Sequence, residues 1–181
     1  NAGLFNTGQA AACLGGYYAN AIKDSGIEFD MLFGPAYKGI PLVTLSASAL
    51  AIDHNIDKPF SYNRKEAKQH GEGGVIVGAP LNGKVLIIDD VITAGTAVKE
   101  AFNLTAESGA TVAGLIISLD RQEIGPSGKS AIQELESNLN IPVISIAKLD
   151  DLIELVKYDD KLKIHLTSIL HYRDQFGIRP K

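Results

Sequence analysis

The sequence has little cysteine and no long apolar run, and each shortage excludes a class of protein. Its 181 residues include one cysteine, Cys13, so no internal disulfide can form and nothing calls for an oxidising compartment. We expect Cys13 to be a small buried apolar side chain. The longest uncharged stretch, residues 39–52, is shorter than the roughly 20 apolar residues that a membrane-spanning helix needs. We therefore expect no membrane partner and a cytoplasmic location.

Positive charge is also in short supply. The chain has 17 Lys and Arg against 21 Asp and Glu, a formal net charge of −4. Binding nucleic acid over a whole surface requires a clustered basic excess, so we expect no nucleic-acid partner. The composition, 45% hydrophobic and 21% charged, is that of an ordinary globular protein. This length favours one domain, residues 1–181, with its own hydrophobic core.

Strand-like and helix-like segments alternate along the chain. Thr7 is a predicted N-cap for a helix that Gly26 ends, and Pro41 is expected to begin a second helix that runs to about Ile52, carries no charge and should be buried. Strands are predicted at residues 29–33, 59–63, 85–88, 112–119 and 143–146, with helices from Thr96, from Ser130 and after the last strand. Continuous Val, Ile and Leu runs in this order predict an α/β fold with a mostly parallel central sheet flanked by helices.

In open sheets of this kind, ligands bind beyond the carboxyl ends of the strands. We therefore look for chemistry in residues 34–39, 64–74, 89–96 and 120–129. The most informative of these loops follows the strand at 85–88.

Two adjacent carboxylates, Asp89 and Asp90, end that strand, and a turn of small residues, 93–96, opens the next helix. The start of a helix offers unpaired N–H groups to a phosphate. Carboxylates would repel a phosphate alone, but they accept hydrogen bonds from sugar hydroxyls or hold Mg²⁺. The combination predicts a ribose 5-phosphate site.

Competing motifs fit less well. Residues 125–130 look like the end of a Walker loop, but Glu123 stands where that pattern needs its first glycine. Gly71 and Gly73 cannot begin a dinucleotide fingerprint, because Ile76 occupies a required glycine position. No cluster of Cys and His predicts a zinc site.

A second candidate loop is basic. It contains Arg64, Lys65, Lys68 and His70 and ends in glycines at 71, 73 and 74. A solvated surface loop would also carry such a run of charge. The glycines favour a mobile basic lid that closes on a polyphosphate, where each cation stabilises the anion by about 4 kcal/mol at 4 Å and an effective dielectric of 20.

These motifs together resemble a known family. Residues 85–97 resemble the signature of the type I phosphoribosyltransferases, which bind phosphoribosyl pyrophosphate (PRPP), and residues 62–74 resemble the catalytic loop of the orotate phosphoribosyltransferases among them. Residues 33–41 and 118–123 resemble that family's pyrophosphate loop and orotate-contacting segment. The resemblance assigns PRPP binding to Tyr37, Lys38, Asp89, Asp90, Thr93, Ala94, Gly95, Thr96 and Ala97, orotate binding to Arg121 and Thr93, and catalysis to Arg64, Lys65, Lys68, His70, Asp89 and Asp90.

The resemblance also implies a reaction: ribose 5-phosphate moves from PRPP to orotate, giving orotidine 5-monophosphate and pyrophosphate in pyrimidine biosynthesis. Mg²⁺ is expected to be held mainly through PRPP, with Asp89 and Asp90 reaching it through water and no direct protein ligand. A homodimer is implied, with the lid of one subunit entering its neighbour's site. The family has further residues before the point that matches Asn1, so we expect an N-terminally incomplete domain that lacks part of the hood region.

Two alternatives stay open at this point. A purine-type phosphoribosyltransferase would share residues 85–97 but not the loop at 62–74. A regulator that binds PRPP only as a signal would lack the lysine and histidine of the lid.

Overall fold

The computed structural model describes residues 2–68, 74–92 and 95–178, without the side chains of residues 67 and 68. The helices are α1 (Gly8–Ser25), α2 (Gly39–His54), α3 (Thr96–Glu107), α4 (Ala131–Leu139), α5 (Leu149–Tyr158) and α6 (Leu166–Phe176), with short 3-10 turns at Ala2–Leu4 and Lys163–His165. The strands are β1 (Met31–Gly34), β2 (Phe60–Lys68), β3 (Gly74–Gly78), β4 (Lys84–Asp89), β5 (Thr111–Asp120) and β6 (Val143–Lys148).

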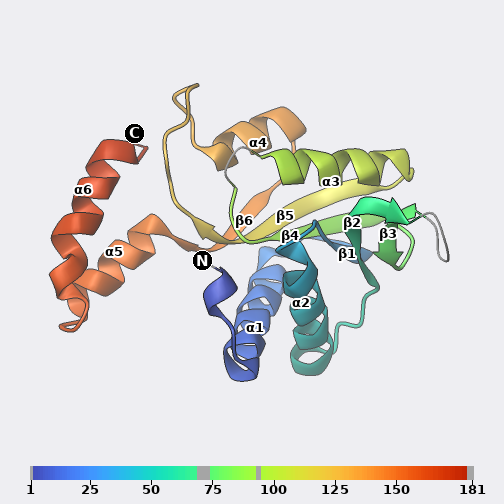
Figure 1. Ribbon diagram of the computed structural model, residues 1–181, viewed down its shortest axis with the longest axis horizontal. Coiled ribbons are helices and arrows are strands. Elements are labelled where there is room, and N and C mark those ends of the chain that lie inside the picture. Colours follow the sequence, from blue (N-terminus) through green and yellow to red (C-terminus); the bar gives the residue numbers. More distant parts are fainter. Residues whose placement is uncertain (1, 69–73, 93–94, 179–181) are drawn as a thin grey trace.

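Within the described residues, the strands form one sheet in the order β3-β2-β1-β4-β5-β6. All neighbouring pairs are parallel except β2 and β3, which are antiparallel. Helices α1 and α2 cover one face and α3 and α4 the other (Figure 1). The α/β fold with a mostly parallel, helix-flanked sheet is therefore confirmed.

Strand β4 shows why the core divides into two layers. Successive side chains of a strand point to opposite faces of the sheet. Val85 and Ile87 pack with α3 and α4, whereas Leu86 and Ile88 pack with α1 and α2. All four side chains are fully buried. A strand buried on both faces reads as a continuous apolar run, which is how it could be predicted from the sequence.

Several predicted ends of helices are confirmed. The hydroxyl of Thr7 accepts a hydrogen bond from the Ala10 amide at 3.2 Å and caps α1, and Gly26 ends this helix in the left-handed region at a φ of 65°. Ser130 caps α4 and forms a capping box with Gln133.

Three predictions about helices are wrong. Helix α2 begins at Gly39, two residues before Pro41, because the turn at residues 34–39 leads directly into it. The helix also extends to His54, so it includes Asp53, and it is only partly buried: Ile52 is 78% exposed. Cys13 is exposed, because Leu14, Tyr18 and Ile22 set the buried face of α1 and Cys13 lies off that face.

The basic segment also differs from its prediction as a loop. Residues 64–68 continue strand β2, which pairs with β3, a strand that the sequence analysis did not predict. The predicted lid is thus at least partly a β-hairpin arm, and its tip, residues 69–73, lies outside the described residues.

Helices α5 and α6 lie to one side of the sheet, beyond β6 (Figure 1). Residues 176–178 return to the loop after β5, where Gly177 forms a β-bridge with Glu123. Among the described residues, no helix is long and apolar enough to cross a membrane.

Candidate functional site

The candidate site lies where strands β1, β4 and β5 end, at one edge of the sheet. Asp89 is the last residue of β4 and Asp90 follows it, and both side chains are buried. The Asp90 amide donates to Asp89 Oδ1 at 2.8 Å. The Asp90 carbonyl accepts hydrogen bonds from the amide and the hydroxyl of Ser118 on β5, at 2.9 and 2.7 Å. The turn that carries both carboxylates is therefore fixed to the neighbouring strand.

The two carboxylates lie on opposite sides of the sheet, because successive side chains along β4 alternate between its two faces. Asp89 lines a cavity beside the start of α3. Asp90 binds Lys38, on the α2 side of the sheet, through an Oδ2–Nζ distance of 2.6 Å. One turn thus presents an acidic group to each side of the strand.

Asp89 has an unusually high pKa. Its pKa is raised from the ordinary 3.8 to about 6, and burial is the largest cause. The hydrogen bond from the Asp90 amide and the charge of Lys38 lower the pKa, whereas the charge of Asp90 raises it. The side chain is therefore a carboxylate at neutral pH that takes up a proton under mildly acidic conditions. An ionised group in this position is ready to accept hydrogen bonds or to face a cation.

The loop between β1 and α2, residues 35–38, is held close to the sheet by an unusually tight approach of backbone. A Cβ atom built on Gly34 would lie 2.1 Å from the Gly39 carbonyl oxygen, and one on Gly39 would lie 2.7 Å from the Gly34 carbonyl carbon. Only glycine fits at either position. Between these residues the Ala36–Tyr37 peptide bond is cis, and the Tyr37 side chain is exposed.

A buried asparagine secures the same loop. Asn63 of β2 accepts a hydrogen bond from the Ala36 amide at 2.7 Å, and its side chain is buried. Asn63 is not among the site residues predicted from the sequence. Its only sequence signal is a polar residue between Tyr62 and the first basic residue of the strand, which is too weak to separate it from a surface asparagine.

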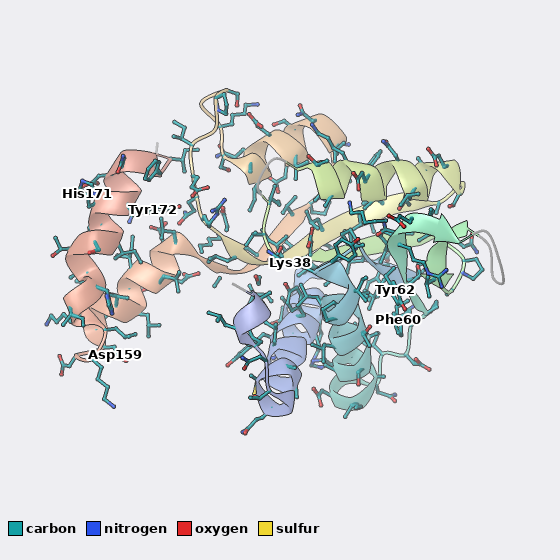
Figure 2. The ribbon with its side chains drawn as sticks, in the orientation of Figure 1. Lys38, Phe60, Tyr62, Asp159, His171 and Tyr172 are labelled. Carbon is teal, nitrogen blue, oxygen red and sulfur yellow. The ribbon has the colours of Figure 1, made fainter. Side chains whose placement is uncertain are left out.

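Lys38 follows this loop and reaches the acidic pair. Its side chain is 57% exposed, whereas that of Asp90 is 9% exposed. The hydrogen bond to Asp90 is the largest cause that raises the Lys38 pKa above its ordinary value, so the ammonium stays charged. The ion pair is open to water on the lysine side, which leaves two donors of the ammonium for another anion. Figure 2 labels Lys38 at the level of the sheet, above α1 and α2.

A cavity of about 260 Å³ lies between β2 and the start of α3. It is lined by residues of β2, of the end of β4 and of the start of α3, namely Lys65, Asp89, Val91, Ile92, Gly95, Thr96, Ala97 and Val98. Gly95 takes a φ of 68° just before the helix begins. The first amides of α3 have no helical partner, so this end of the cavity favours an anion. Asp89, which is predicted to bind the ribose, and Gly95, Thr96 and Ala97, which are predicted to bind the 5-phosphate, therefore line the same cavity.

The basic residues are placed unequally. Lys65 pairs with Glu100 of α3 at 2.9 Å and lines the cavity with Asp89 in the same chain. Arg64 lines a neighbouring hollow between β2, β3 and α3. The backbone of Lys68 ends β2, but its side chain lies outside the described residues, as do His70, Thr93 and Ala94 entirely. Their predicted roles stay predictions.

Arg121 lies just after β5 and does not line this cavity as far as the described residues define it. Its Nη2 pairs with Glu123 Oε2 at 2.9 Å. The other oxygen of Glu123 accepts a hydrogen bond from the hydroxyl of Tyr172 on α6. The predicted orotate-binding residue is therefore tied to the last helix, a contact between distant parts of the chain that the sequence did not indicate.

Tyr18 of α1 is a second supporting residue that sequence analysis missed. Its ring is fully buried and its hydroxyl donates to the Asp89 carbonyl at 2.7 Å. Burial raises the pKa of this phenol, so it stays a donor at any ordinary pH. Helix α1 therefore helps to fix the turn that carries Asp89 and Asp90.

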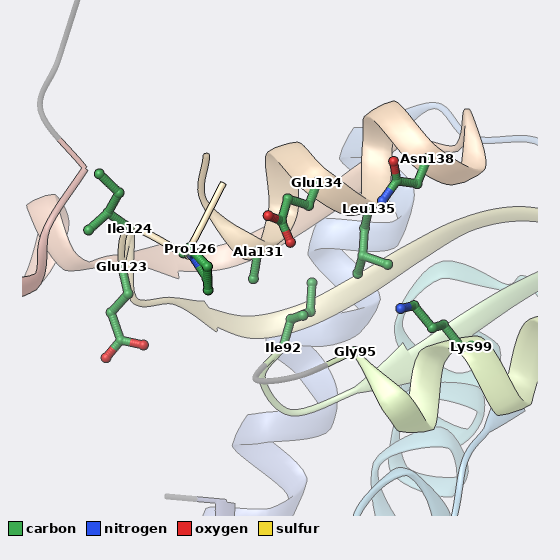
Figure 3. Close-up of a pocket in the computed structure, with 11 residues that line it drawn as sticks. Ile92, Gly95, Lys99, Glu123, Ile124, Pro126, Ala131, Glu134, Leu135 and Asn138 are labelled. Carbon is green, nitrogen blue, oxygen red and sulfur yellow. The ribbon is translucent and has the colours of Figure 1, made fainter. Parts of the chain in front are cut away.

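A larger cavity, of about 340 Å³, adjoins the first and shares Ile92 and Gly95 with it. It lies between α3, α4 and the loop at 123–126, with Lys99 and Glu134 at its polar walls (Figure 3). It extends the open space from the start of α3 towards the loop that contains Glu123.

The available metal ligands are few. No group of three or more His, Cys, Asp or Glu side chains that could hold a metal ion occurs in the part of the chain that the structure describes. Asp89 and Asp90 are the acidic groups of the site, and carboxylate oxygen is the ligand type that Mg²⁺ prefers. The residues present fit an ion that is shared with a polyanionic ligand.

Known proteins match this chain over most of its length. Residues 4–139 match the family model described as the Phosphoribosyl transferase domain. Orotate phosphoribosyltransferases of Shigella sonnei and Serratia proteamaculans are each 56% identical over 178 residues, which is 98% of this chain and 84% of theirs. A crystal structure of orotate phosphoribosyltransferase from Francisella tularensis is 42% identical with a TM-score of 0.84, covering 98% of this chain and 85% of that one.

Proposed function

Because this chain belongs to the orotate phosphoribosyltransferase family, we propose that it transfers ribose 5-phosphate from PRPP to orotate. The products are orotidine 5-monophosphate and pyrophosphate, and the reaction is a step of pyrimidine biosynthesis. The observation that carries this proposal is the cavity where Asp89, Lys65 and the start of α3 meet. It joins acceptors for sugar hydroxyls to donors for phosphate, which is what a ribose phosphate needs.

Each part of PRPP has a counterpart in this geometry. The 5-phosphate would bind the unpaired amides at the start of α3, with the Thr96 hydroxyl and the residues at 93–95 around it. The ribose hydroxyls would donate to Asp89 and Asp90. The diphosphate would lie towards Tyr37 and Lys38, whose ammonium is held at the site's edge by Asp90.

In the reaction, the bond between C1 of ribose and the pyrophosphate oxygen breaks, and its electron pair leaves with pyrophosphate. N1 of orotate then bonds to C1 and loses its proton to the departing pyrophosphate or to water. Positive charge develops on C1 and negative charge on the leaving group, so cations near the diphosphate lower the barrier. We assign this role to Arg64, Lys65, Lys68 and His70, each worth up to about 4 kcal/mol at 4 Å and an effective dielectric of 20.

Mg²⁺ fits as a shared ion. Asp89 and Asp90 would contact it through water, and PRPP would supply its other ligands. When bound, it neutralises part of the diphosphate charge. The protein's own contribution is to hold PRPP and orotate in line and to exclude water, with no covalent nucleophile.

We further propose that the chain works as a homodimer in the cytoplasm, with no nucleic acid or membrane as partner. The exposed Ile52 near the end of α2 and the exposed Tyr37 just before its start support a covered surface on this helix. The basic arm β2 supports a lid whose tip enters the neighbouring site. The lone cysteine supports a reducing compartment.

The proposal is tested by supplying the chain with PRPP, Mg²⁺ and orotate and measuring both products by chromatography. We expect orotidine 5-monophosphate and pyrophosphate in equal amounts, and no product when adenine replaces orotate. Asp89→Asn should reduce kcat/KM by about 10- to 100-fold, since it removes a charged acceptor. Asp24→Asn, an exposed acid on α1, is the matched control.

Two results would contradict the proposal. Consumption of adenine instead of orotate would identify a purine-type enzyme. Tight PRPP binding with no consumption of orotate at any pH would identify a regulator that uses PRPP as a signal.

A further inference from the structure

We propose that Glu123 and Tyr172 are positioning residues that set orotate specificity by fixing the guanidinium of Arg121. This inference rests on the proposed function and adds α6 to the parts of the chain that build the base-binding side of the site. It is carried by a continuous series of contacts: Arg121 Nη2 to Glu123 Oε2 at 2.9 Å, and Glu123 Oε1 to the Tyr172 hydroxyl.

The backbone around these side chains is fixed by the same two segments. The Ile124 amide donates to the Phe176 carbonyl at 2.8 Å, and the Ile178 amide donates to the Gln122 carbonyl at 2.7 Å. Gln122 itself has a φ of 51°, which a non-glycine residue rarely adopts. The Tyr172 and Phe176 rings pack with centroids 5.2 Å apart. The loop that carries Arg121 and the end of α6 therefore form one unit.

The pairing leaves Arg121 able to bind an anion. A guanidinium has five N–H donors in one plane, and the contact with Glu123 uses one N–H of Nη2. Nη2 carries a second N–H, which with Nε or Nη1 on the unoccupied edge can form the paired, planar hydrogen bonds that suit a carboxylate on a flat base. The side chains of Arg121 and Glu123 are 39% and 33% exposed, so a ligand can reach the pair.

Tyr172 keeps a single oxygen of Glu123 directed at Arg121. By donating to Oε1, its hydroxyl holds that oxygen, so that Glu123 faces the guanidinium with Oε2. The hydrogen bond to Glu123 and partial burial raise the Tyr172 pKa, so the hydroxyl remains a donor at neutral pH. Without it, Glu123 is free to turn both oxygens towards Arg121 and compete with an incoming carboxylate.

A different role for Glu123 makes the opposite prediction. If its carboxylate merely occupies Arg121 until orotate displaces it, then neutralising Glu123 should strengthen orotate binding. If Glu123 orients Arg121, neutralising it should weaken orotate binding. The sign of the change in the KM for orotate therefore decides between the two roles.

The test compares steady-state kinetics of the parent, Glu123→Gln and Tyr172→Phe with orotate and PRPP varied separately. We expect the KM for orotate to rise about tenfold in Glu123→Gln and about threefold in Tyr172→Phe, with the KM for PRPP and the thermal midpoint unchanged. Tyr158→Phe, which removes an exposed hydroxyl on α5, is the matched control. Arg173→Gln, which breaks the Arg173–Asp150 ion pair of α6, controls for loosening of that helix.

The outcomes separate this inference from the proposed function. An unchanged or lower KM for orotate in both variants, with an active parent, overturns the positioning role and leaves the function standing. An equal rise in the KM for both substrates, or an equal rise in Arg173→Gln, also overturns it, because the effect would then be structural. If the parent converts no orotate, the proposed function fails, and the inference fails with it.

Discussion

Asp89 combines burial with charge, and this combination links stability to function at the scale of one residue. A buried carboxylate is costly to ionise, which is why burial raises its pKa to about 6. The same carboxylate is the proposed acceptor for ribose hydroxyls, so it must be ionised to work. The folded chain therefore holds a charge at neutral pH that destabilises it.

We predict that Asp89→Asn stabilises the chain above pH 6 while it lowers activity. The folded pKa of about 6 lies above the ordinary 3.8, so the folded state binds the proton more tightly. In the parent, this contribution therefore favours folding as the pH falls through 6 and opposes folding above it. The difference between the two pKa values corresponds to about 3 kcal/mol at most.

The measurement is urea unfolding of the parent and Asp89→Asn between pH 4 and 8. The variant should have the larger free energy of unfolding at pH 8, and the difference should shrink below pH 6 and vanish near pH 4. Binding of PRPP with Mg²⁺ by the parent should weaken over the same range. A difference in stability that is constant with pH would show that Asp89 carries no such charge cost.

At the scale of elements, the turn between β1 and α2 depends on two glycines. We predict that Gly34→Ala destabilises the chain by roughly 3 kcal/mol and raises the KM for PRPP, because the new Cβ would lie 2.1 Å from the Gly39 carbonyl oxygen. Backbone must move to relieve this contact, and the displaced loop carries Tyr37 and Lys38. Thermal unfolding and PRPP kinetics measure the two effects.

Gly16→Ala is the control for the same substitution in a free position. A Cβ on Gly16 meets nothing within 4 Å, and the residue lies inside α1. Alanine should raise the stability there by about 0.5–1 kcal/mol, since glycine is a poor helix former. Equal effects of the two substitutions would contradict the packing argument.

The elements also show how far sequence reasoning reaches. Strands β4 and β5 and the acidic turn could be predicted, because the residues that define them are adjacent in the sequence. Strand β3 was missed: it has five residues with a glycine at each end, and it exists because β2 is there to pair with it. The exposure of Cys13 was missed because the buried face of α1 is chosen by its packing on α2 and the sheet.

Contacts between distant residues could not be predicted from the sequence at all. The Tyr18 hydroxyl bonds a carbonyl 71 residues away, and Asn63 bonds an amide 27 residues away. Both are ordinary residue types in ordinary segments. The strand order, which places β2, β1 and β4 side by side, and the packing of α1 on the sheet bring these partners together.

At the scale of the whole molecule, we propose that some residues of the basic arm β2 act in the site of their own chain and others act in the site of a second subunit. Lys65 lines the cavity of Asp89 within one chain and pairs there with Glu100. Lys68 is three residues further along the arm, close to the tip that is proposed to cross. Lys65 and Lys68 should therefore differ in which Asp89 they serve.

Mixing two variants of low activity tests this difference. If Lys68 serves the partner, Lys68→Ala mixed with Asp89→Asn gives heterodimers with one intact site and one doubly altered site. Random pairing makes half of the dimers heterodimers, so activity should recover to about one quarter of the parent level. Lys65→Ala mixed with Asp89→Asn should recover none, because every site then lacks one of the two groups. Recovery in both mixtures would place Lys65 in the crossing part of the arm, and recovery in neither would mean that each lid closes on its own chain.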